Sequence, residues 1–331
     1  MHGEPHVSVC IRAHSRTDAL RSAIASALSQ TYTDLEVVVS DDSGRLASVV
    51  TAFDDPRVRY HRNPEPAGAT ANLTRVVSLA RAPLVAILND DDEWLPGFLA
   101  TAVGVLDSHP DVGVVFTDDY LEARGRRTRR RLPYRPGRHD RFLSDLLEHS
   151  MPASTTVGRR AVWTGGDGSV SIPPDTVGME LVWLRAASGG WPFYYVDEPL
   201  GISRFNREQV SLSDDELPTR QIATYGAFRF EDPTCEELRR ARVAEFLLAR
   251  AHVRLRRRRL RDARADIARA NATSPRALGL RAAIALSGLR GLAIRWGCSH
   301  PRALVALLEL WRRMRPPLLP KLAAGGRDLP R

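Results

Sequence analysis

Apolar residues in the first half of the chain form short continuous runs, separated by stretches in which they recur every three or four positions. The runs lie at residues 7–11, 35–39, 84–88 and 112–116, with a shorter and more polar one at 58–61. Helical spacing covers residues 15–29, 68–80 and 97–108, and Ser15 with Asp18 fits a capping box at the start of the first helix. Strands alternating with helices predict an α/β fold with a mostly parallel sheet and helices on both faces.

Acidic residues gather where three of the predicted strands end. Asp41 and Asp42 follow the second strand, residues 90–92 the fourth, and residues 118–119 the fifth. In open α/β sheets, ligands bind at the carboxyl ends of the strands. Adjacent carboxylates repel each other unless a cation offsets the repulsion, so the clusters predict a metal or ligand site. The alternative interpretation is a set of solvated turns that cap the following helices.

Charge is distributed unevenly over the 331 residues. The formal net charge is +9, yet the first 120 residues are acidic, the remainder is strongly basic, and nearly all the positive charge is arginine. The length predicts one core of roughly 200 residues with an appendage. A basic nucleic-acid-binding or scaffold protein is one interpretation of the back half. The acidic front half and the lack of a recognised nucleic-acid module favour a function without nucleic acid.

Cysteine usage and the N-terminus bear on the compartment. Cys10, Cys235 and Cys298 are far apart and have no C-x-x-C spacing, so neither a disulfide framework nor a zinc site is indicated. We expect neither a signal peptide nor a membrane-spanning helix. The expectation is a cytoplasmic protein, either soluble or peripheral at the inner face of the membrane.

The pattern changes to helices alone in the back third. We expect a catalytic domain over residues 1–215, a helical region over 216–324 and a disordered tail over 325–331. An Arg-rich turn at 254–261 divides a helical hairpin, and the last amphipathic segments predict docking, oligomerisation or contact with a membrane surface. A second basic run, at 124–131, is interpreted as an exposed hairpin or loop that is solvated or attracts an anionic partner.

Several segments together resemble one protein family. Ser29-Gln30-Thr31-Tyr32 precedes the second strand with its Asp41-Asp42-Ser43 end, and Asn89-Asp90-Asp91-Asp92 follows the fourth strand. Residues 181–187 and 194–204 match a closing helix and strand. Over residues 7–210 the chain resembles the family-2 inverting glycosyltransferases, which have the GT-A nucleotide-sugar fold. The resemblance implies an enzyme that uses a nucleotide-diphosphate sugar.

The resemblance also implies roles for residues of the nucleotide half. Asp42 contacts the nucleotide base, and Asp41 supports its loop. Asn72 corresponds to a loop residue near the nucleotide, although a lone Asn is also typical of a helix cap. Arg12, at the end of the first strand, and Asp90 face the same pocket.

The same resemblance implies that residues 89–92 contain the metal ligands. Asp91 is the preferred ligand of Mn²⁺ or Mg²⁺, with Asp92 beside it, and Asn89 stands where many members have Asp. A hard divalent cation bridges the donor phosphates and offsets the charge that builds on the leaving group.

The sequence identifies the general base less clearly than the metal ligands. An inverting transfer needs a general base, and Met179 occupies the position where related enzymes have Asp. Glu180 is the first candidate and Asp175 the second, while Glu180 could equally be a first-turn acid that complements the helix dipole.

The leading hypothesis is a metal-dependent glycosyltransferase that takes a UDP- or dTDP-sugar and acts on a glycan, lipid-linked or small-molecule hydroxyl. A donor-binding pseudoenzyme is the alternative that Met179 suggests.

Overall fold

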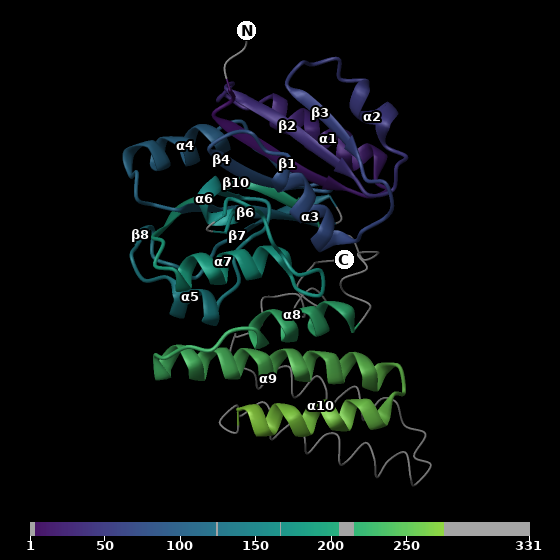
Figure 1. Ribbon diagram of the computed structural model, residues 1–331, viewed down its shortest axis with the longest axis vertical. Coiled ribbons are helices and arrows are strands. Elements are labelled where there is room, and N and C mark those ends of the chain that lie inside the picture. The colour runs from purple at the N-terminus through teal and green to yellow at the C-terminus, as the bar shows by residue number, and fades with distance from the viewer. Residues whose placement is uncertain (1–3, 124, 166, 205–214, 275–331) are drawn as a thin grey trace. The chain divides into compact units, whose positions relative to one another are not determined.

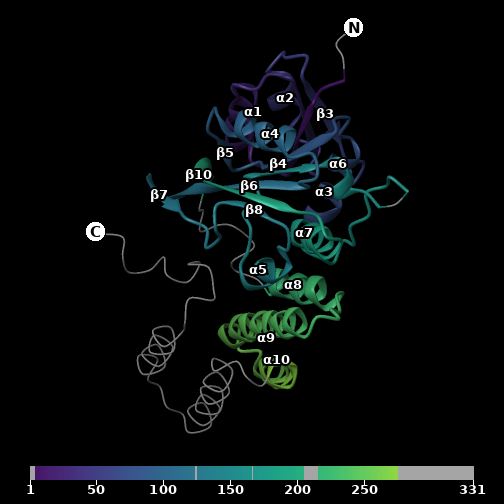
Figure 2. The same ribbon diagram turned by 90° about the vertical axis from the view of Figure 1, so that its left-hand side faces the viewer.

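A computed structural model describes residues 4–123, 125–165, 167–204 and 215–274. The chain divides into two compact units, which are shown in two orientations in Figure 1 and Figure 2. The first unit comprises residues 1–146 and 151–209, and the second comprises residues 147–150 and 210–331. The boundary near residue 210 lies close to the predicted one at 215. Cys298 and the predicted segments beyond residue 274 lie outside the described residues.

Ten strands of the described chain form one mixed sheet in the first unit. They are β1 (Val7–Ala13), β2 (Leu35–Asp41), β3 (Val58–Arg62), β4 (Leu84–Asn89), β5 (Glu93–Trp94), β6 (Val114–Ala123), β7 (Arg126–Arg130), β8 (Gly137–His139), β9 (Thr156–Arg159) and β10 (Phe193–Arg204). Their hydrogen-bonded order is β3-β2-β1-β4-β9-β6-β10-β5, with β7 beside β6 and β8 beside β10. The strands β3, β2, β1 and β4 run parallel to one another, which confirms the predicted α/β sheet. β9 enters antiparallel between β4 and β6.

Helices cover both faces of this sheet (Figure 1). They are α1 (Thr17–Leu28), α2 (Ala47–Thr51), α3 (Ala69–Ser78), α4 (Phe98–Ser108), α5 (Leu143–Glu148), α6 (Arg160–Trp163) and α7 (Gly178–Ser188). On one face, Val9 and Val37 belong to a core cluster that also contains buried residues of α1, α2 and α4. Cys10 points to the other face, where its thiol donates to the carbonyl of Val76 in α3. The alternation of side chains along β1 therefore places helices on both sides.

α3 and α7 approach each other closely. A Cβ atom on Gly178 would lie 2.8 Å from Cδ2 of Leu73, so a larger residue at the start of α7 would force the Leu73 side chain to shift. The Thr70 hydroxyl donates to the carbonyl of Thr176 at 2.7 Å. These contacts fix the first turn of α7 beside the first turn of α3.

Two local predictions are wrong. The first helix has Arg16 at its N-cap with no side-chain capping bond, so Ser15 and Asp18 do not form the expected capping box. The third acid cluster does not end a strand, because β6 continues to Ala123 and buries Asp118 and Asp119 within its length.

The basic run at 124–131 supplies the partners of these two buried acids. It contains β7, which pairs antiparallel with β6 as a hairpin. Arg129 donates to Asp118 at 2.8 Å, and Arg130 pairs with Asp119. Tyr195 on β10 also donates to Asp118, at 2.6 Å. Much of the charge of this run is therefore compensated inside the sheet rather than offered to an anionic partner.

The described part of the second unit is helical. It contains α8 (Glu216–Gly226), α9 (Pro233–Arg256) and α10 (Leu260–Thr273). Asp232 caps α9 by accepting from the Cys235 amide at 2.7 Å, and Pro233 occupies the first turn, where its missing N–H is not needed. The buried Asp266 of α10 pairs with Arg250 and Arg254 of α9 at 2.7 and 2.8 Å. The predicted helical hairpin is thus present. Among the described helices, none combines the length and the apolar character needed to cross a membrane.

Candidate active site at the strand ends

The parallel strands β1, β2 and β4 end at one edge of the sheet, and the predicted residues meet there. Arg12 and Ala13 of β1 are in register with Ser40 and Asp41 of β2, and Arg12 is also in register with Asn89 of β4. The Arg12 guanidinium donates to the Asn89 side chain at 3.2 Å and to the Ala69 carbonyl at 3.4 Å. Three strand ends and the first turn of α3 therefore surround one point.

Asp41 organises the turn that follows β2. It is fully buried, and its Oδ1 accepts from the amides of Ser43 and Gly44 and from the Ser43 hydroxyl. Its Oδ2 accepts from the Leu46 amide at 2.8 Å and from the Tyr60 hydroxyl at 2.9 Å. Burial favours a higher pKa for this carboxyl, but the hydrogen bonds outweigh it and lower the pKa. This geometry is consistent with the predicted support of the loop.

Asp42 holds the loop that leads into α3. Its oxygens accept from the amides of Ala67 and Gly68 at 2.8 and 2.9 Å and from the Asn63 amide group at 2.8 Å. Burial raises the pKa of Asp42, but these bonds outweigh it and the net pKa is lowered. Asp42 is only 6% exposed, so a contact with a nucleotide base stays a prediction.

Asn72 lies inside the network rather than on its surface. Its amide nitrogen donates to the carbonyls of Ala13 and Ser40, and its oxygen accepts from Asn63 at 3.1 Å. Both polar atoms are therefore engaged within the protein, and the side chain is buried. Asn72 thus positions α3 against the ends of β1 and β2, and its place near a nucleotide stays a prediction. It is not a helix cap, because Gly68 occupies the N-cap of α3.

Asp90 and Asp91 share one cation, the guanidinium of Arg16. Arg16 lies 3.5 Å from Asp90 and forms a close ion pair with Asp91. Both carboxylates are partly exposed, and the His14 amide donates to Asp90 at 3.4 Å. Burial and then the charge of Asp91 raise the pKa of Asp90. The predicted acid run thus places two neighbouring carboxylates where a positive charge stabilises them.

Asp92 turns away from this pair. It is buried, and it accepts from the Ser154 hydroxyl, the Asn89 amide group and the Arg204 backbone amide. Burial and the charge of Asp91 raise the pKa of Asp92 to about 6. With three donors inside the protein, Asp92 ties β4 to β10 and to the segment before β9. The predicted metal-ligand role of Asp92 stays a prediction, and the partly exposed Asp91 and Asp90 are the more accessible carboxylates.

The carboxylates of Asp90 and Asp91 fit a divalent cation that is shared with a ligand. Within the described ranges, no group of three or more His, Cys, Asp and Glu side chains is arranged to hold a metal ion. A cation that bridges two phosphates needs only one or two protein carboxylates, because phosphate and water oxygens complete its shell. Carboxylate oxygens suit Mg²⁺ and Mn²⁺, and the position of Arg16 indicates that a cation is accommodated between Asp90 and Asp91.

The candidate bases lie at the start of α7. Met179, at the position expected for the base, is buried. Glu180 follows it in the first turn of α7 and is partly exposed, and Asp175 is exposed in the preceding loop. The Thr70–Thr176 bond brings this segment beside the first turn of α3. Which of the two acids serves as a base stays a prediction.

Several residues of the network were not predicted as site residues. Asn63 links Asp42 to Asn72, while Ser154 and Arg204 hold Asp92. None of them stands in an acid cluster, so the sequence did not mark them as site residues. Asn63 follows β3, which pairs with β2, whereas Ser154 and Arg204 are brought in by the segment before β9 and by the end of β10.

Residues 8–164 match the family model described as glycosyl transferase family 2. The chain is similar to the GalNAc(5)-diNAcBac-PP-undecaprenol beta-1,3-glucosyltransferase of Campylobacter jejuni, with 37% identity over 102 residues that cover 29% of this chain and 33% of the relative. It is also similar to the UDP-Glc:alpha-D-GlcNAc-diphosphoundecaprenol beta-1,3-glucosyltransferase WfaP of Escherichia coli. The identity is 25% over 118 residues, which cover 35% of this chain and 47% of the relative. The matches thus span less than half of these curated relatives.

Solved structures share the fold. TarS 1–349 of S. aureus, in complex with UDP-GlcNAc, superposes with a TM-score of 0.62 at 15% identity, covering 88% of this chain and 92% of that one. The mannosyltransferase PcManGT of Pyrobaculum calidifontis, in complex with GDP-Man and Mn²⁺, gives a TM-score of 0.56 at 17% identity, covering 94% and 87%. At these identities the likeness concerns the fold alone. Residues 8–164 thus carry the sequence pattern of glycosyltransferase family 2, and the described sheet and helices share the fold of these solved structures.

Proposed function

We propose that the protein transfers a sugar from a nucleotide-diphosphate donor, UDP- or dTDP-linked, to an acceptor hydroxyl, with inversion and with a divalent cation at Asp91. The observation that carries the proposal is the Asp90–Arg16–Asp91 group at the end of β4, beside the ends of β1 and β2. Carboxylates at this edge suit a cation, and the neighbouring arginines suit phosphate oxygens.

The chain's own residues divide the work of binding. Asp42 and Asn72 hold the loop and the first turn of α3 that border the donor. Arg12 and Arg16 lie at the same edge and offer guanidinium donors to the diphosphate. A divalent cation bound at Asp91 supplies Lewis-acid stabilisation of the leaving diphosphate. Arg16, the present partner of Asp91, would lie at the same edge and could donate to the phosphates.

The acceptor hydroxyl must lose a proton as it attacks the anomeric carbon. We propose Glu180 as the base and keep Asp175 as the alternative, because both lie on the segment that packs beside α3. The names of two relatives, both beta-1,3-glucosyltransferases with an undecaprenol-linked substrate, support a glucosyl donor and a lipid-linked diphosphate acceptor for this chain.

A donor panel tests this proposal. UDP-, dTDP- and GDP-sugars are incubated with the full chain and manganese, and the released nucleotide is measured with and without a chelator. We expect release from a UDP- or dTDP-sugar that the chelator abolishes. Binding of a donor without release or transfer to any acceptor would favour a donor-binding pseudoenzyme, the second candidate, which the buried Met179 at the base position favours. No binding of any donor would contradict both.

A further inference from the structure

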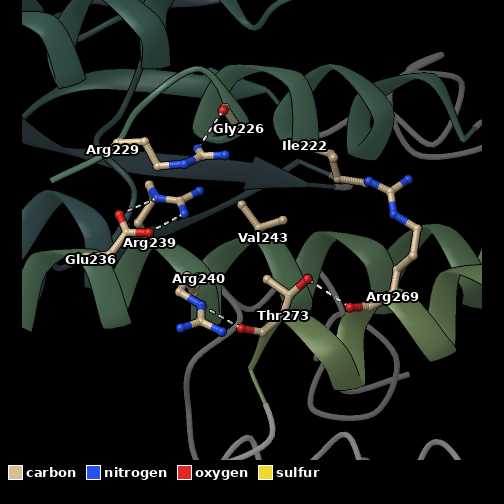
Figure 3. A pocket seen from close by; sticks show the side chains of 9 residues that line it. All are labelled: Ile222, Gly226, Arg229, Glu236, Arg239, Arg240, Val243, Arg269 and Thr273. Atoms are coloured by element: carbon tan, nitrogen blue, oxygen red, sulfur yellow. Dashed lines mark hydrogen bonds and ion pairs between the residues drawn. The ribbon is translucent and has the colours of Figure 1, made fainter. Parts of the chain in front are cut away.

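The helical unit contains a cavity that the proposed transferase site does not use. Its volume is about 520 Å³, and its walls come from α8, α9 and α10. Figure 3 shows Arg229, Arg239 and Arg240 on one side of this cavity, Arg269 on the other, and Val243 between them. A cavity of this size is large enough for a small ligand. All of these residues belong to the second unit.

Charge is the main property of the lining. Four arginines and one glutamate, Glu236, line the cavity, so the charged side chains of its lining have an excess of three positive charges. Arg239 is buried, and it donates to Glu236 at 2.8 Å and to the Tyr225 carbonyl at 3.2 Å. Because this ion pair satisfies both partners, Arg239 forms a fixed floor and Glu236 is occupied.

The other three arginines are exposed at the rim. Arg229 donates through Nη1 to the carbonyls of Gly226 and Phe228, and Arg240 donates through Nε to the Thr273 carbonyl at 2.8 Å. Within the described part of the chain, none of Arg229, Arg240 and Arg269 has a carboxylate within 4.0 Å. Each guanidinium has five N–H donors, so most of these donors remain for a ligand.

Capping of helix ends explains only part of this arrangement. The bonds from Arg229 and Arg240 satisfy terminal carbonyls of α8 and α10, which is a common use of arginine. Neutral side chains could provide the same bonds. Two such arginines, a third from the opposite wall and a fourth in the floor exceed what capping requires. The four arginines concentrate positively charged hydrogen-bond donors around one cavity.

We propose that this cavity binds a phosphate or diphosphate group, either free in solution or as the head of a lipid. Planar guanidinium groups bind phosphate oxygens in pairs, and a partly enclosed site strengthens these charge-assisted bonds. The apolar side chains of Ile222 and Val243 also line the cavity and suit an organic substituent of the phosphate. The site is separate from the proposed donor site and does not depend on a metal.

The test measures binding of inorganic pyrophosphate to the full chain by calorimetry. The buffer contains EDTA, so no divalent ions are available. We expect Arg269→Ala and Arg240→Ala each to weaken pyrophosphate binding by roughly tenfold or more, the loss of one charge-assisted contact. Arg264→Ala is the matched control, because Arg264 is also exposed on α10 but does not line the cavity. Asp91→Asn should leave this binding unchanged, which separates it from the proposed donor site. Circular dichroism confirms that each variant is folded.

A second arm identifies the source of the phosphate. Vesicles of phosphatidylcholine alone are compared with vesicles that also contain phosphatidylglycerol, by co-sedimentation of the full chain. Pyrophosphate binding that depends on Arg269 supports a soluble ligand, and vesicle binding that depends on Arg269 supports a lipid head group. Failure of the wild type to bind either probe overturns the proposal. An equal loss in Arg264→Ala also overturns it, because binding then follows net charge rather than the cavity.

Discussion

Replacing Asp41 by Asn tests the network that shapes the candidate active site. The carboxylate is fully buried and accepts five hydrogen bonds, three at Oδ1 and two at Oδ2. In the variant, an amide NH₂ group replaces one oxygen. If it replaces Oδ2, the Tyr60 hydroxyl can turn to accept, but the Leu46 N–H meets another donor. In the reverse orientation, the amides of Ser43 and Gly44 lose their acceptor.

The magnitude follows from these contacts. One buried backbone N–H without a partner costs about 1–3 kcal/mol, and the three remaining bonds lose their ionic assistance. A neutral amide is less costly to bury than a carboxylate, which offsets part of the loss. We therefore expect Asp41→Asn to lower the free energy of unfolding by about 2–4 kcal/mol.

Urea unfolding of the full chain, followed by tryptophan fluorescence, measures this change. Asp34→Asn is the control, because Asp34 is exposed just before β2 and should change stability by less than about 0.5 kcal/mol. Since the pKa of Asp41 is lowered in the folded protein, its contribution is complete above the ordinary value of 3.8. It is lost as the pH falls through the folded-state pKa, so wild type and variant should converge in acid. Equal stability of Asp41→Asn and Asp34→Asn near pH 7 would refute the reasoning.

Three further predictions concern the base, the helix contact and the helical unit. Glu180→Gln should lower donor turnover by about 10²- to 10⁴-fold while Asp175→Asn retains it, measured as released nucleotide; the reverse result would assign the base to Asp175. Gly178→Ala should lower the free energy of unfolding, measured by thermal melting, by about 1–3 kcal/mol, because the new Cβ would lie 2.8 Å from Cδ2 of Leu73 in α3. Gly97→Ala is the control, because no atom lies within 4 Å of a Cβ at that position. Asp266→Ala should destabilise the helical unit by about 3–5 kcal/mol, because it leaves two arginines without their buried partner; an unchanged far-UV dichroism melting curve would contradict this.

The sheet could be predicted from the sequence because its strands are uninterrupted apolar runs. β1, β2 and β4 are buried on both faces, and each ends at a polar cluster that marks the edge of the sheet. The predicted convergence of Arg12, Asp42 and Asp90 follows from this parallel arrangement. The insertion of β9 between β4 and β6 was not predictable, because a four-residue strand carries little periodic signal.

The acid clusters could be found from the sequence, but their separate roles could not. Asp90, Asp91 and Asp92 are consecutive, yet only the first two face Arg16, while Asp92 turns inward to Ser154. Asp118 resembled a strand-end acid because it follows the largely apolar run at residues 112–116, but the strand continues. The difference depends on partners that only folding brings into contact: the arginines of β7, eleven residues along the chain in the paired hairpin strand, and Ser154, 62 residues from Asp92.

The central claim is that Asp91 holds a divalent cation against the diphosphate of the donor. Calorimetric titration of UDP into the full chain, with manganese and with EDTA, tests it most directly, with Asp34→Asn as control for Asp91→Asn. We expect manganese to strengthen UDP binding in the wild type and in Asp34→Asn, and we expect this gain to fall by roughly tenfold or more in Asp91→Asn. UDP binding that manganese strengthens equally in all three proteins would contradict the claim.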